Sequence, residues 1–322
     1  MEVINGLEKN TVSIKKAASK CSILMIIVTL LSFLSNILLI IVRNISADFN
    51  NLILGMSDEY SNVMFGMVPV IFIDIVVIVI GLKWTKISFK KEFINKGRYD
   101  KKTILIGMIS LAGLLLLSNS IYTIYSTIIN SMGIVIPSPD FTFPTNINIR
   151  IIYILYVCIL GPILEEIIFR GIILNYMKKY GLFVAIIFSA VLFTMFHMNL
   201  VQFITPLLIG ILFGFICIKT ESIVPSIILH IVNNSYATIM SYIYVVNISL
   251  ASKLWIGFLG IAAIGLVILF TKYFKEINEI FSYERKSSNL KRKFINCFLN
   301  GGFLAYMIIY SGLILITFLR TN

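Results

Sequence analysis

The stretch SILMIIVTLLSFLSNILLIIV, residues 22–42, contains no charged side chain. An α-helix needs roughly 20 apolar residues to cross the hydrocarbon core of a bilayer, which is about 30 Å thick. The stretch is long enough for this, and it lacks the small-residue cleavage site that ends a secretory signal peptide. It therefore predicts an uncleaved transmembrane helix.

Comparable apolar runs recur along the whole chain. Of the 322 residues, 58% are hydrophobic and only 13% are charged, which is typical of a polytopic membrane protein. We expect an all-α fold, a transmembrane helical bundle of about eight or nine spans that forms a single membrane domain over residues 1–322. The predicted spans are 22–42, 62–82, 103–129, 149–174, 182–198, 201–218, 223–247, 254–272 and 295–319.

The basic residues are concentrated in alternate loops. Of the 27 Lys and Arg side chains, 22 lie in the segments on the N-terminal side, four lie on the other side and Arg170 lies within a span. This bias predicts a cytoplasmic N-terminus and explains the net charge of +12 without a nucleic-acid partner. We expect residues 272–294 to be a solvated cytoplasmic loop, with binding to anionic membrane lipid as a second possibility. The segments on the N-terminal side are 1–21, 83–102, 175–181, 219–222 and 272–294.

The cysteine pattern and the amino-acid composition indicate where the protein is expected to reside. The four cysteines lie far apart and form neither a disulfide framework nor a C-x-x-C metal pattern. The chain is rich in Ile, Asn and Lys, as expected of an AT-rich bacterial source, so we expect an integral protein of a bacterial plasma membrane.

Two glutamates and an arginine interrupt the apolar stretch ILEEIIFRG, residues 163–171. Glu166 and Arg170 are spaced i, i+4, so they share a helix face and can form an ion pair. Glu165 points about 100° away and stays free of that pair. The alternative is that all three side chains form one buried salt-bridge cluster. Charges in a membrane span are costly, so either arrangement needs polar neighbours.

The only two histidines of the chain, His197 and His230, follow within the next apolar spans. Phe193 lies one turn before His197, and Asn234 one turn after His230. A lone histidine in an apolar span is usually a packing residue, but two of them at a similar depth to the glutamates favour one polar site shared by three helices. We expect Phe193 to pack, and we interpret the isolated Asp74 as a packing or hydrogen-bonding acid.

Several glycine and proline residues lie within these spans. Gly161–Pro162 precedes the glutamates and Pro225 precedes His230, so we expect helix distortion at both places. Gly210 and Gly214 form a G-x-x-x-G pattern, which predicts close helix packing.

Three motifs now stand in order on successive spans: Glu165-Glu166-x-x-x-Arg170, Phe193-x-x-x-His197 and His230-x-x-x-Asn234. Together they resemble the signature of the CPBP family of intramembrane proteases (CAAX-processing and bacteriocin-processing proteases, also called Abi), which includes the Ras-converting CAAX endoprotease. The resemblance covers about residues 149–247, which would be a catalytic core formed by the fourth to seventh spans.

The resemblance implies an endopeptidase that hydrolyses a peptide bond in the membrane. Glu165 would be the general base, and His197 would help to hold and activate the water. His230 and Asn234 would donate hydrogen bonds to the oxyanion, while Glu166 and Arg170 would brace the site. The substrate would be a peptide precursor or the tail of a membrane-associated protein.

Metal dependence and two other functions stay open at this point. Glu165, His197 and His230 could bind zinc with an open fourth position, but no H-E-x-x-H motif is present, and a site without metal or other cofactor is favoured. Buried Glu and His would also suit an ion- or proton-coupled transporter. A bacteriocin self-immunity protein of the same family is the other alternative. The sequence specifies neither the cleavage site nor the oligomeric state.

Overall fold

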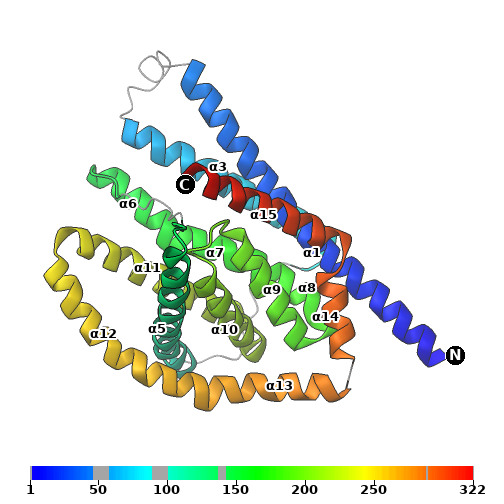
Figure 1. Ribbon diagram of the computed structural model, residues 1–322. Coiled ribbons are helices and arrows are strands. Elements are labelled where there is room, and N and C mark those ends of the chain that lie inside the picture. Colours follow the sequence, from blue (N-terminus) through cyan, green and yellow to red (C-terminus); the bar gives the residue numbers. More distant parts are fainter. Residues whose placement is uncertain (1, 46–57, 89–100, 137–142, 288, 322) are drawn as a thin grey trace.

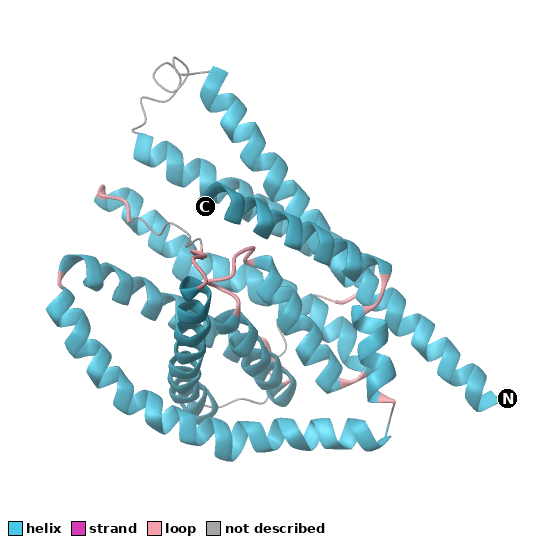
Figure 2. Ribbon diagram, in the orientation of Figure 1, coloured by secondary structure: helices cyan, strands magenta, loops and turns pink. Residues whose placement is uncertain are grey.

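The computed structural model describes residues 2–45, 58–88, 101–136, 143–287 and 289–321. Within these ranges every element is helical and there is no strand, which confirms the predicted all-α bundle (Figure 2). The helices begin with α1 (Glu2–Ile45), α3 (Asp58–Thr85), α5 (Lys101–Ser131), α6 (Ile147–Leu155), η2 (Tyr156–Leu160), α7 (Gly161–Glu166), η3 (Ile167–Leu174), α8 (Asn175–Met177) and η4 (Lys178–Tyr180). They continue with α9 (Leu182–Phe196), α10 (Ile204–Thr220), α11 (Val224–Val246), α12 (Ile248–Ile268), η5 (Leu269–Tyr273), α13 (Phe274–Ser287), α14 (Leu290–Phe298) and α15 (Gly301–Thr321).

Six of the described helical stretches are long and apolar enough to cross a membrane. Their outward faces are apolar, as on α1, where Leu34 and Leu38 are 59% and 61% exposed. Contact with lipid explains such exposure, because lipid tails are as apolar as these side chains. The chain is therefore an integral membrane protein. The six stretches are Ser13–Ile41, Gly66–Thr85, Lys101–Ser131, Ile147–Tyr180, Ile248–Lys286 and Gly301–Leu319.

The remaining predicted spans are α9, α10 and α11. α9 and α10 have 15 and 17 residues and are apolar but short, and α11 has 23 residues. The number of eight or nine spans stays a prediction.

α9 and α10 form the tightly packed centre of the bundle. A methyl group on Gly210 would lie 3.0 Å from Cα and Cβ of Ala190, and one on Gly214 would lie 3.5 Å from Ile186. The close packing predicted from the G-x-x-x-G pattern is thus confirmed. The aromatic side chains of Phe169 and Phe213 fill the surrounding core.

A second close contact joins the middle of α5 to the C-terminal part of α12. Gly113 of α5 and Gly265 of α12 face each other, and a methyl group on either would overlap the backbone of the other helix. Two facing glycines let the backbones touch directly. This crossing attaches the C-terminal helices to the centre of the bundle.

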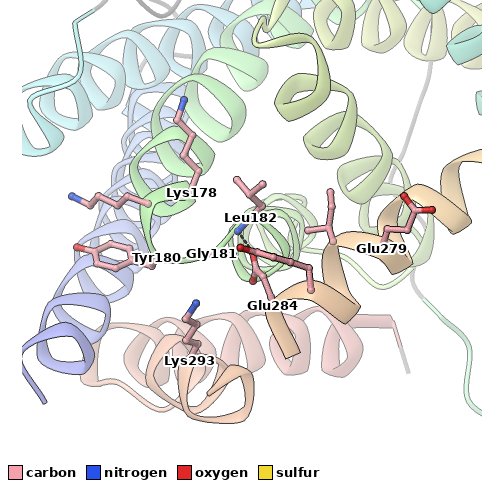
Figure 3. A pocket seen from close by; sticks show the side chains of 10 residues that line it. Lys178, Tyr180, Gly181, Leu182, Glu279, Glu284 and Lys293 are labelled. Carbon is pink, nitrogen blue, oxygen red and sulfur yellow. Dashed lines mark hydrogen bonds between the residues drawn. The ribbon is translucent and has the colours of Figure 1, made fainter. Parts of the chain in front are cut away.

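The segment 272–294 is not the solvated loop that we expected, because most of it forms the helices α13 and α14. Glu284 is buried and accepts a hydrogen bond from the backbone N–H of Leu182 at the start of α9 (Figure 3). It accepts a second from the backbone N–H of Phe183. Lys219 of α10 also pairs with Glu276 of α13 at 2.5 Å. One buried and one exposed polar contact thus join the segment to the bundle.

The last predicted span starts later than expected. Residues 295–298 belong to α14, and α15 begins at Gly301. Between them, Oδ1 of Asn300 accepts a hydrogen bond from the backbone N–H of Phe303 at 3.0 Å. This contact caps α15 and separates the two helices.

Candidate functional site

The two adjacent glutamates end the short helix α7, which lies between the π-helical segments η2 and η3. In η2 the N–H of Gly161 bonds to the carbonyl of Tyr156, and Pro162 follows, so the distortion predicted at Gly161–Pro162 takes the form of a π-bulge. Such bulges are frequent at functional sites. Pro225, in contrast, lies in the first turn of α11, where a missing N–H breaks no hydrogen bond, so the distortion expected before His230 is absent.

Glu166 and Arg170 form the predicted ion pair. Nη1 of Arg170 donates to Oε1 of Glu166 at 2.9 Å, and both side chains are completely buried. Nη2 also donates to the carbonyl of Gly210 at 3.4 Å. The guanidinium carbon lies 4.4 Å from the ring centre of Phe193 and 5.6 Å from that of Phe213, so two aromatic faces cover this charge.

His230 connects the two glutamates. Its Nδ1 lies 2.9 Å from Oε1 of Glu166, and its Nε2 lies 3.7 Å from Oε2 of Glu165. A carboxylate can only accept, so Nδ1 carries the hydrogen that bonds Glu166. His230 itself is buried. The first and the third motif are therefore joined directly, through Glu166 and His230, which lie 64 residues apart in the sequence.

Glu165 is the carboxylate that stays free of the arginine, as the helix geometry predicted. Its side chain is 18% exposed, and its buried Oε2 accepts no hydrogen bond from any residue that the structure describes. Lone pairs on this oxygen are available to take a proton. A carboxylate that is close to an imidazole and only partly exposed is suited to general-base chemistry.

His197 ends α9 and belongs to the same cluster. Its Nδ1 lies 3.0 Å from the carbonyl of Phe193. Because a carbonyl only accepts, Nδ1 is the donor, and a neutral ring presents Nε2 as an acceptor. The ring centre of Phe193 lies 5.0 Å from that of His197 and 5.7 Å from that of His230. Phe193 thus packs between the histidines, as expected.

Asn234 lies one turn beyond His230 and is turned toward η2. Its Nδ2 donates to the carbonyl of Val157 at 2.9 Å, and its Oδ1 accepts from Nδ2 of Asn233 at 3.0 Å. Both predicted oxyanion donors, His230 and Asn234, therefore have partners within the protein.

The donor atoms for a metal do not converge. Within the described residues, no three His, Cys, Asp or Glu side chains are arranged to hold a metal ion. The conditional zinc set of Glu165, His197 and His230 is accordingly not assembled as a metal site.

Asp74 of α3 is an additional buried acid at this site. It is 2% exposed, and its Oδ1 has no hydrogen-bond partner in the described part of the chain. α3 packs against α7 and η3 and runs in the same direction (Figure 1), and a methyl group on Gly81 would lie 3.1 Å from Ile172. Asp74 lies two turns before Gly81, on the side of α3 that packs against α7 and η3, and Glu165 belongs to α7. The two carboxyl groups lie within electrostatic range of each other.

The sequence interpretation took Asp74 as an isolated packing or hydrogen-bonding acid and did not relate it to Glu165. A packing role accounts for the burial of Asp74, and its electrostatic range to Glu165 is an additional feature of the site. The signal was present, because an ionisable residue inside a span is a candidate functional residue by default. The relative register of α3 and α7, which makes the pairing visible, cannot be read from spacing within either helix.

Residues 147–236 are similar to a known family. They match the sequence model of the family described as type II CAAX prenyl endopeptidase Rce1-like. This range overlaps the predicted catalytic core, residues 149–247, and it includes all three motifs. The resemblance to CAAX-type proteases is therefore confirmed for this segment, which is less than a third of the chain.

A curated protein of Bacillus subtilis (strain 168) is also similar. It is YdiL, named as a candidate membrane peptidase, and it is 37% identical over 83 residues. The aligned part covers 26% of this chain and 34% of YdiL, so the chain spans about a third of that relative. No solved structure matches the chain.

Proposed function

We propose that this integral membrane protein is an intramembrane endopeptidase of the CAAX-protease type, with Glu165 as its general base. The observation that supports this most directly is the position of His230, which bonds Glu166 and faces Glu165. This contact brings residues of two motifs into one cluster, and that cluster lies within the segment similar to Rce1-like endopeptidases.

The chemistry begins with water beside Glu165. Glu165 takes a proton from the water while the water oxygen attacks the carbonyl carbon of the peptide bond. Nε2 of His197, the acceptor of its neutral ring, receives the second hydrogen bond of that water. The C–N bond then breaks, and Glu165 returns the proton to the leaving amine. Positioned proton transfer of this kind contributes roughly 10²- to 10⁴-fold to a rate.

The developing oxyanion needs hydrogen-bond donors. Nε2 of His230 is 3.7 Å from Glu165, which is too long for a hydrogen bond, so a protonated ring can offer this N–H to substrate. Asn234 can contribute its amide when the bond to Val157 is exchanged for one to substrate. Glu166 and Arg170 hold the His230 ring in place through Nδ1 and take no part in proton transfer.

The substrate is a peptide precursor or the tail of a membrane-associated protein, since the site lies between apolar helices. The charge bias of the loops supports a cytoplasmic N-terminus, and the composition supports a bacterial plasma membrane.

The test compares the peptides released by cells that carry the wild type with those released by cells that carry Glu165→Gln. Gln keeps the size of the side chain and removes its ability to take a proton. Peptides that require Glu165 identify the substrates, and Glu279→Gln, a change at an exposed glutamate far along the chain, serves as the control. We expect the control to release the wild-type set.

Two outcomes would count against the proposal. Identical peptide sets in the wild type and Glu165→Gln would remove the endopeptidase assignment. Proton or ion flux that depends on Glu165, without any change in peptides, would favour the transporter.

A further inference from the structure

A pocket of about 280 Å³ opens beside the candidate site, between the helical run 147–160 and α11. One wall carries Arg150, Ile154 and Cys158, and the other carries Ser235, Thr238 and Tyr242. The volume lies just below the roughly 300–1,000 Å³ of pockets for drug-sized ligands. It is therefore of a size for one large side chain or a short piece of chain.

Both ends of the pocket are defined by side-chain contacts. At the outer end, Nη1 of Arg150 bonds to the hydroxyl of Tyr242 at 3.3 Å, and the ring of Phe143 lies 5.5 Å from that of Tyr242. At the inner end, Sγ of Cys158 bonds to Oγ1 of Thr238 at 3.5 Å. The space between them is walled mainly by aliphatic and aromatic groups.

The pocket continues the faces that carry the catalytic candidates. On α11, Tyr242, Thr238, Asn234 and His230 follow one another at intervals of four residues, so they lie along one face of the helix. The contact from Asn234 to the carbonyl of Val157 forms the boundary between the pocket and the site, since the pocket residues Ser235 and Cys158 are the next residues in sequence.

The helices separate where the pocket lies. α11 packs closely against η2 and α7, but α6 and the C-terminal half of α11 move apart toward their outer ends (Figure 1).

Ser235 indicates what kind of molecule fits. A helical serine in an apolar setting normally bonds to a carbonyl one turn earlier. The hydroxyl of Ser235 has no hydrogen-bond partner among the described residues, although other serines of the chain bond in this way, such as Ser120 to Leu116. A polar atom without a partner suits a ligand with a peptide backbone better than an acyl chain.

We propose that this pocket binds the apolar side chain next to the scissile bond of the substrate peptide, with the Ser235 hydroxyl bonding to the peptide backbone. This inference rests on the proposed endopeptidase function, and it adds the feature of the substrate that the enzyme selects.

The test maps the residues that flank every Glu165-dependent cleavage site, by mass spectrometry of peptides from cells carrying each variant. Thr238→Phe fills the pocket, and Ile239→Ala widens it at a position that is 57% exposed, where truncation leaves the core intact. Val245→Phe, at a 78% exposed position of the same helix and outside the pocket, is the matched control.

We expect Thr238→Phe to reduce cleavage next to Leu, Ile or Phe by roughly 10- to 100-fold, with a much smaller effect next to Ala or Gly. Ile239→Ala should shift cleavage toward bulkier residues, and Val245→Phe should leave the pattern unchanged. If Thr238→Phe does not accumulate in the membrane, the residue preference of Ile239→Ala alone tests whether the pocket selects substrate.

Three results would overturn the inference in different ways. An unchanged residue preference in Ile239→Ala would show that the pocket does not select substrate. A uniform loss at all cleavage sites would indicate a lipid chain or a structural role for the pocket. Absence of any Glu165-dependent cleavage in the wild type would remove the proposed function, and this inference with it.

Discussion

Nδ1 of His230 and Oε1 of Glu166 lie 2.9 Å apart, and that carboxylate oxygen also accepts a hydrogen bond from Arg170 at 2.9 Å. Oε1 of Glu166 therefore holds both the guanidinium of Arg170, a few residues along the same helical run, and the imidazole of His230 on α11. Bonds that involve charged groups are short and strong in a buried setting. The same contact determines which ring nitrogen of His230 faces Glu165.

The first prediction is that Glu165 and Glu166 contribute unequally to the free energy of unfolding. Glu166→Ala leaves Arg170 buried without its partner, which should lower the free energy of unfolding by about 3–5 kcal/mol. Glu165 forms no ion pair with Arg170 among the described residues, so Glu165→Ala should change stability much less. Thermal unfolding of the protein in detergent measures both. Equal losses in the two variants would support the single salt-bridge cluster instead.

The second prediction concerns His197. Its side chain contacts Phe193 and the backbone but no ion-pair partner in the described residues, so His197→Gln should keep the fold. Cleavage of a peptide identified through its Glu165 dependence should fall at least ~100-fold. The measurement is a single-turnover rate with purified enzyme, alongside its thermal unfolding. A rate within threefold of the wild type would remove His197 from the reaction.

The third prediction addresses metal dependence. No three donor side chains converge in the described part of the chain, so 1,10-phenanthroline should leave peptide cleavage unchanged. The measurement is the cleavage rate before and after chelation and dialysis. Loss of activity that zinc restores would show that Glu165 and the histidines rearrange to bind a metal.

The fourth prediction tests Asp74. Two carboxyl groups within electrostatic range of each other in a desolvated site do not both ionise readily, and Glu165 must be ionised to act as a base. We therefore expect Asp74 to be the protonated member, so that the neutral Asp74→Asn retains most of the activity. Asp74→Leu, of similar size but unable to form hydrogen bonds, should lose at least ~10-fold if Asp74 donates a hydrogen bond during the reaction. Equal rates in Asn and Leu variants would restrict Asp74 to packing.

Much of the fold and part of the site could be predicted because the signals lie within single helices. Charge-free runs define spans, and the i, i+4 spacing of Glu166 and Arg170 predicts their ion pair without knowledge of any other helix. The contacts between helices could not be obtained in this way. His230 was expected to donate to an oxyanion, and its bond to Glu166 becomes visible only when α7 and α11 are placed together.

The same limit explains the error at residues 272–294. Their charges are typical of a solvated loop, and nothing nearby in the sequence indicates a partner for Glu284. That partner is the start of α9, about 100 residues earlier, where the unpaired N–H groups of a helix attract a carboxylate.

The last prediction follows from this contact. Glu284 accepts from Leu182 and Phe183, so Glu284→Ala should lower the free energy of unfolding by about 1–2 kcal/mol, as for loss of a helix cap. Glu279→Ala, at an exposed position of the same helix, α13, should change it by no more than about 0.5 kcal/mol.

Gly181 makes the prediction sharper, because a Cβ there would lie 2.7 Å from Oε2 of Glu284 and its φ is +149°. Gly181→Ala should therefore destabilise the wild type more than it destabilises Glu284→Ala, where the clash is gone and only backbone strain remains. A double-mutant cycle of thermal unfolding measures the difference. Additive effects would show that Glu284 does not hold the start of α9.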